Sequence, residues 1–139
     1  MVIGMIAVCV AAGAGQAQDT AAKTTFSGVY SEKQATAGKD VYAGLCQGCH
    51  TEESHTGPVF QGAWIGKPLW DLFHYIQREM PKTEPGSLTL EQYGQVLAYL
   101  LKLNAMPPGE ADMPTDSVVL KTIRFDTISA AAARKPNRR

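Results

Sequence analysis

The chain contains few of the residues on which metal and redox chemistry usually depends, with three cysteines and three histidines among 139 residues. It also has no net charge, because 13 basic residues balance 13 acidic ones, and this argues against a nucleic-acid partner. The sequence lacks nucleophile motifs, Walker loops and dinucleotide fingerprints. These absences exclude the common classes of independent enzyme that such motifs mark.

The apolar run from Met1 to Ala12 is too short to span a bilayer, so no transmembrane helix is expected in the mature chain. Residues 1–17 carry no charged side chain and pass from that run into small residues, as in the second half of a secretory signal. The positive first region of such signals is missing, because no Lys or Arg precedes Lys23. We interpret residues 1–17 as a signal peptide and expect a periplasmic or otherwise exported protein.

Removal of this signal would remove Cys9 and leave two cysteines, both within Cys46-Gln47-Gly48-Cys49-His50. This C-x-x-C-H spacing is typical of haem c attachment. Both thiols then form thioethers to the porphyrin, and the adjacent imidazole binds the iron. The pattern therefore predicts one covalently bound haem c, held by Cys46, Cys49 and His50.

Three other interpretations of the motif explain fewer of its residues. A thioredoxin-like dithiol needs a preceding strand, whereas the residues before Cys46 have a helical pattern. A zinc site needs three or four protein ligands, and there is no second cysteine pair. A disulfide between Cys46 and Cys49 leaves His50 without a role.

Apolar periodicity predicts an all-α protein with about four helices and long loops. The first helix is expected from about Gln34 to the haem motif, with Ala37, Val41 and Leu45 along one face. The Gly-rich segment 51–67 is expected to be a loop.

The second helix should have Pro68 in its first turn and end at Pro81. Its predicted apolar face consists of Leu69, Leu72, Phe73 and Ile76.

A third helix is predicted to begin with a capping box formed by Thr89 and Gln92 and to end at Asn104. Thr115 could cap a short last helix. The apolar stripe of the third helix is predicted to be Leu90, Tyr93, Val96, Leu97, Leu100 and Leu101.

We expect residues 18–33 to be a linker, 34–126 the folded domain and 127–139 a disordered basic tail.

The second axial ligand decides whether iron only transfers electrons or also binds exogenous ligands. Met80, at a helix end before Pro81, is the first candidate, but the residues alone leave others open. His55 is only five residues beyond His50, and His74 lies beside an apolar stripe, where a buried structural histidine is common. The remaining candidates are Met106 and Met113.

The segments "CQGCH" and "MPKTEPGSLTLEQYGQVLAYLLKLNAMPPGEADMP" resemble class I monohaem c-type cytochromes. The chain is most similar to the cytochrome c domains and subunits found with bacterial quinoprotein (PQQ-type) dehydrogenases, over about residues 37–123. The resemblance implies a small cytochrome c fold with His50 as proximal ligand and Met80 as distal ligand. It also implies that the Pro58 carbonyl accepts a hydrogen bond from the other ring nitrogen of His50, and that Met106 is a packing residue.

These expectations favour an exported electron-transfer protein, not itself an enzyme, with a His/Met-ligated haem. Its partners would be redox proteins such as a quinoprotein dehydrogenase, a respiratory complex or a terminal oxidase. One alternative is a haem enzyme or a gas or peroxide sensor in which the Met ligand is displaced. Another is a subunit that transfers electrons only within a larger dehydrogenase or respiratory complex. Candidate pocket residues are Trp64, Trp70, Phe73 and Tyr75.

Overall fold

The computed structural model describes residues 23–128, and within them the chain forms helices and no strand. The all-α prediction is therefore confirmed. The expected signal peptide and residues 129–139 of the expected tail lie outside the described residues. The helices are α1 (Glu32–Leu45), the 3-10 helix η1 (Glu52–His55), α2 (Gly57–Trp64), α3 (Leu69–Glu79), α4 (Leu90–Leu103) and α5 (Ser117–Thr122).

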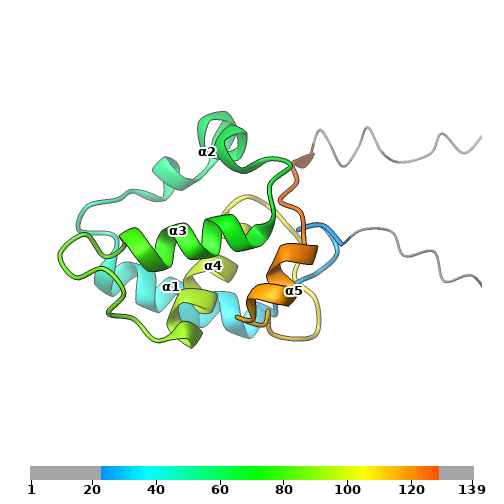
Figure 1. The fold of residues 1–139 in the computed structure, drawn as a ribbon. Coiled ribbons are helices and arrows are strands. Elements are labelled where there is room, and N and C mark those ends of the chain that lie inside the picture. The colour runs from blue at the N-terminus through cyan, green and yellow to red at the C-terminus, as the bar shows by residue number, and fades with distance from the viewer. Residues whose placement is uncertain (1–22, 129–139) are drawn as a thin grey trace, which may run out of the picture.

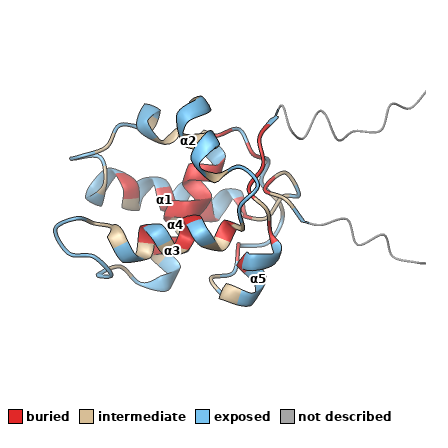
Figure 2. Ribbon diagram, turned by 45° about the horizontal axis from the view of Figure 1, so that its top comes forward, coloured by how far each residue is buried: buried red, intermediate tan, exposed pale blue. Residues whose placement is uncertain are grey.

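Helices α1 and α4 form the main helix pair of the core, and α3 packs on both α4 and α5 (Figure 1). The two axes of the main pair approach closely at Gly38, where an added Cβ would lie 1.8 Å from the Gln95 carbonyl oxygen. Glycine at this position lets the two backbones meet. Figure 2 shows that the buried residues gather around α4, while α2 is largely exposed.

The predicted face of α1 is wrong, although the helix itself is present. Leu45 is 51% exposed, and Ala37 and Val41 are only half-buried. Because the two helices cross at Gly38, a different side of α1 faces α4. That side includes small and polar residues, which apolar periodicity does not identify. The buried residues of α1 are Gln34, Ala35, Gly38 and Tyr42.

Helices α3 and α4 agree more closely with the sequence. All four residues predicted for the α3 face are buried, although Pro68 lies at the cap position before the first helical residue. The Thr89–Gln92 capping box of α4 is present, and Asn104 is its C-cap. The prediction that Leu90 belongs to the apolar stripe is wrong, since Leu90 is 52% exposed in the first turn of α4. The other residues of the predicted stripe are buried.

The prediction of a loop over residues 51–67 is wrong, because this segment contains both η1 and α2. The local signal was a proline in the first turn of α2, with Phe60 and Trp64 one helical turn apart. Gly57 has a positive φ of 73°, which lets the chain turn into the helix directly after η1.

The segments flanking the helices pack into the fold. Tyr30, within the expected linker, is fully buried and donates a 2.6 Å hydrogen bond to the Met106 carbonyl. Thr127, at the start of the expected tail, is also buried. Helix α5 is capped by Asp116, which accepts from the Val118 and Val119 amides, so the expected cap at Thr115 is corrected by one residue.

Candidate functional site

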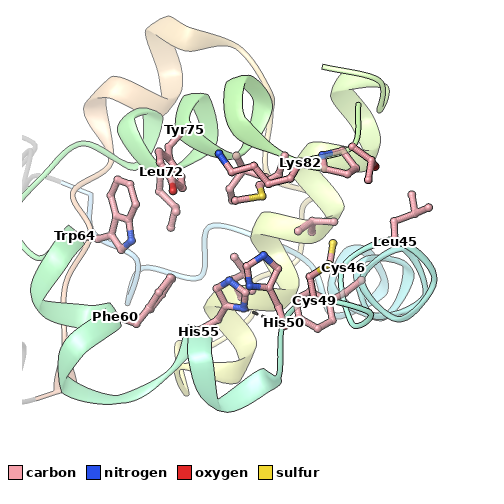
Figure 3. Close-up of a pocket in the computed structure, with 17 residues that line it drawn as sticks. Leu45, Cys46, Cys49, His50, His55, Phe60, Trp64, Leu72, Tyr75 and Lys82 are labelled. Carbon is pink, nitrogen blue, oxygen red and sulfur yellow. Dashed lines mark hydrogen bonds between the residues drawn. The ribbon is translucent and has the colours of Figure 1, made fainter. Parts of the chain in front are cut away.

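A cavity of about 370 Å³ opens between α1, α2, α3 and α4, within the roughly 300–1,000 Å³ range of small-molecule and cofactor sites. In Figure 3, Cys46 and Cys49 lie on one side, with His50 and His55 adjoining them. Leu72 and Tyr75 lie across the cavity from these histidines. Most of its wall is apolar, and its largest apolar side chains belong to Leu45, Phe60, Trp64, Leu72, Ile76, Val96 and Leu100.

The haem motif forms a tight turn at the end of α1. The Cys46 amide donates to the Tyr42 carbonyl at 2.8 Å, and the His50 amide donates back to the Cys46 carbonyl at 2.9 Å. This turn brings the side chains of Cys46, Cys49 and His50 to the same cavity. Burial raises the pKa of the Cys46 thiol, whereas Cys49 is exposed.

His55 lies against His50, with ring centroids 4.8 Å apart. The Tyr42 hydroxyl donates to the Thr51 carbonyl at 3.1 Å and also lies 2.9 Å from His55 Nδ1. A single hydroxyl hydrogen cannot serve both partners, so in this arrangement Nδ1–H of His55 donates to the tyrosine oxygen. Burial, and next the nearby His50, lower the pKa of His55. His55 therefore adjoins His50 and does not face it across the cavity.

Met80 reaches the cavity from the opposite wall, as the C-cap residue of α3. Its amide donates to the Ile76 carbonyl at 2.9 Å, and its carbonyl accepts from the Tyr93 hydroxyl at 2.8 Å. Hydrogen bonds from two helices thus hold the Met80 backbone. The thioether is the second donor that the cavity brings together with His50.

The other candidate ligands lie elsewhere. Met106 and Met113 are buried in the core and do not line the cavity. His74 also lies outside it, stacked on Trp70 with ring centroids 5.2 Å apart, and its buried Nδ1 has no hydrogen-bond partner within the described residues.

The remaining predicted pocket residues divide into two groups. Trp64 and Tyr75 line the cavity, with ring centroids 5.5 Å apart. Phe73 is a core residue and Trp70 stacks on it, so neither reaches the cavity. Pro58 lies exposed in the first turn of α2, outside the cavity lining.

The sequence did not indicate the residues that hold the segments around His50 and Met80 in place. Tyr93 was expected only as part of the apolar stripe of α4, and Tyr42 was not among the residues predicted for any role. Asn104, expected only to end α4, also donates to the His55 carbonyl at 2.8 Å and accepts from Gln61 Nε2 at 3.1 Å. It therefore connects η1, α2 and α4, and no local pattern could have shown this.

The donor set fits haem c. Two thiols and an imidazole come from one turn, a thioether comes from the opposite wall, and apolar side chains line the space between them. Within residues 23–128, no three His, Cys, Asp or Glu side chains cluster so as to hold a metal ion without a macrocycle. The two thiols, the imidazole, the thioether and the apolar walls together suit a metal that is enclosed in a porphyrin.

No helix within residues 23–128 has the length and apolar character needed to cross a bilayer. Comparison with curated proteins gave no match, and comparison with solved structures gave none. Residues 33–100 match the family model described as cytochrome c oxidase, cbb3-type, subunit III. The matched segment contains the haem motif, Met80 and all the residues that line the cavity. Together with the C-x-x-C-H motif, this match supports a c-type cytochrome, that is, a haem-binding electron-transfer protein.

Proposed function

We propose that this protein is an exported monohaem cytochrome c that carries single electrons through a haem with His50 and Met80 as axial ligands. The observation that carries the proposal is the convergence of Cys46, Cys49, His50 and Met80 on one apolar-walled cavity. Bound haem would supply one-electron exchange between ferric and ferrous iron.

The residues of the chain would control that exchange in three ways. Cys46 and Cys49 would attach the macrocycle, and His50 and Met80 would fill both axial positions so that no substrate binds the metal. Leu72, Ile76 and the other apolar wall residues would limit the access of water, which shifts the reduction potential. Tyr93 would hold the Met80 backbone against the cavity. The Pro58 carbonyl remains a proposed acceptor for the second ring nitrogen of His50.

The optical and near-infrared spectra of the purified full chain test this ligation. We expect a low-spin reduced haem and, in the oxidised protein, the sulfur-to-iron charge-transfer band of Met ligation. High-spin or bis-imidazole spectra would contradict the assignment of Met80.

Substitution of the distal ligand is a sharper test. Met80→Ala should abolish the charge-transfer band and leave an open or water-bound iron, because no other methionine of residues 23–128 lines the cavity. The matched control is Met106→Ala, which removes a buried methionine outside the cavity. The control should lower stability by about 2–5 kcal/mol but keep the band. Unchanged coordination in Met80→Ala would defeat the assignment.

An alternative is a haem enzyme or a gas or peroxide sensor in which Met80 dissociates. Fast binding of carbon monoxide to the reduced wild-type protein at neutral pH would favour this alternative. The hydrogen bonds at both the amide and the carbonyl of Met80 favour a ligand that stays in place.

The matched family takes its name from a subunit of a respiratory oxidase. We therefore propose a respiratory complex or terminal oxidase as redox partner, whether the protein is a free carrier or a subunit. The comparisons provide no support for a quinoprotein dehydrogenase. The test mixes the reduced protein with membranes that contain or lack the terminal oxidase. We expect rapid reoxidation by the first membranes and none by the second.

A further inference from the structure

Helix α2 forms one wall of the cavity although none of its residues is buried. It contributes Phe60 and Trp64 to the lining. One side-chain hydrogen bond, from Gln61 to Asn104, connects it to the end of α4. A helix without a buried face cannot be held by its own packing, so its position depends on the few segments that contact it.

Residues 123–126 are one such segment, because they pair with the connection between α2 and α3 (Figure 1). The Leu69 amide donates to the Ile123 carbonyl at 2.7 Å. The Phe125 amide donates to the Lys67 carbonyl at 2.9 Å, and the Gly66 amide donates back to the Phe125 carbonyl at 2.9 Å. These bonds fix the chain immediately after α2.

The other edge of this segment is also paired. The Thr25 amide donates to the Arg124 carbonyl at 3.0 Å, and the Arg124 amide donates to the Lys23 carbonyl at 2.9 Å. The Asp126 amide donates to Thr25 Oγ1 at 3.0 Å. Residues 123–126 are thus held between two distant parts of the chain, and they lie outside the segment that matches the cytochrome family.

A continuous row of rings leads from this segment to the proximal histidine. Phe125 is 1% exposed, and its ring meets Phe60 at a centroid distance of 6.2 Å and an interplanar angle of 75°. Phe60 meets His55 edge-on at 5.8 Å, and His55 lies 4.8 Å from His50. Figure 3 shows Phe60, His55 and His50 following one another along the same side of the cavity.

We infer that Phe125 is a positioning residue, which sets the place of α2 and, through Phe60 and His55, the orientation of the His50 ring. The inference rests on the proposed function, because the orientation of His50 matters only if it binds the haem iron. Interiors are close-packed, so a change at one end of such a row is transmitted to its neighbours.

The test compares Phe125→Ala with Leu120→Ala in the full-length holoprotein. Leu120 is a fully buried residue of α5 that does not line the cavity, so its substitution is a matched loss of core packing. Three properties are measured: amide hydrogen exchange of residues 57–64, the electron paramagnetic resonance spectrum of the ferric protein, and the reduction potential.

We expect Phe125→Ala to speed exchange in α2 by about tenfold relative to Leu120→Ala. Phe125→Ala should also shift the electron paramagnetic resonance spectrum and the reduction potential. Leu120→Ala should leave both at their wild-type values. Phe125→Leu, which keeps apolar volume, should restore most of the wild-type behaviour. If Phe125→Ala does not fold, Phe125→Val is compared with Leu120→Val in the same three measurements, and the same differences are expected on a smaller scale.

Equal α2 exchange in the two alanine variants, with unchanged spectra and potentials, would overturn the inference and leave Phe125 as an ordinary core residue. That result is distinct from failure of the proposed function. The latter would appear in the wild-type protein, as the absence of a His/Met haem spectrum before any substitution is made.

Discussion

At the scale of single residues, tyrosines of α1 and α4 contact the chain beside each of the two proposed axial ligands. Tyr42 of α1 contacts His55, which adjoins His50, and Tyr93 of α4 donates to the Met80 carbonyl. Both tyrosines are almost fully buried, so each hydroxyl is placed by the packing of its ring. A buried carbonyl without its donor is costly, and these contacts therefore act on both stability and ligand position.

Tyr93→Phe tests this role for the Met80 side of the cavity. The variant should lose about 0.5–1.5 kcal/mol of unfolding free energy, because the Met80 carbonyl loses a hydrogen bond. The charge-transfer band should also disappear at a lower temperature than the helical circular dichroism signal. Tyr75→Phe, which alters an exposed tyrosine lining the same cavity, is the control and should leave both transitions unchanged. Coincident transitions in Tyr93→Phe would contradict the role.

At the scale of helices, the crossing of α1 and α4 determines which side of α1 carries the haem motif to the cavity. This crossing depends on Gly38, since the carbonyl of Gln95 occupies the space of any Cβ. Leu45 lies nearly two turns further along α1 and lines the cavity because of the same rotation of the helix. The geometry of one helix pair thus sets the position of the motif.

Gly38→Ala should destabilise the protein by about 1–3 kcal/mol, because the added methyl group separates two closely packed backbones. Gly44→Ala is a control in the same helix, since nothing lies within 4 Å of the added Cβ. The control should be neutral or up to about 1 kcal/mol more stable, because alanine is the better helix former. Denaturant unfolding of both variants makes the comparison, and similar free energies would refute the close crossing.

At the scale of the whole molecule, the segment before α1 is joined to the segment after α4 through Tyr30. Burial, and then the charge of Glu32, raise the pKa of Tyr30 from 10.0 to about 12. The folded protein therefore retains this proton in a pH range where the unfolded chain releases it. The resulting stability is fully present below pH 10 and is lost as the pH rises toward 12.

Unfolding free energies measured across this range should fall with pH in the wild-type protein. Tyr30→Phe should start from a lower value, since the Met106 carbonyl loses its donor, and should then fall less steeply. The remaining slope would come from Tyr42 and Tyr99, whose pKa values burial also raises to about 12. Parallel curves for the two proteins would show that Tyr30 does not contribute to the pH dependence.

Features that depend on nearby residues could be predicted from the sequence. The Thr89–Gln92 capping box and the apolar face of α3 involve residues three or four apart, so their spacing determines the contacts. The C-x-x-C-H motif is local in the same sense. The sequence by itself therefore determined the all-α class, the positions of α3 and α4, and the residues expected to bind haem.

The tertiary structure alone decided which of these elements meet. It buried Gln34, Gly38 and Tyr42 where apolar spacing pointed to another face of α1, and it formed α2 in a segment rich in glycine and turn-forming residues. It also brought Phe125 to the ring of Phe60, 65 positions away in the sequence. Such contacts depend on where helices cross and how chain segments pair, and these are properties of the packed molecule that no local spacing encodes.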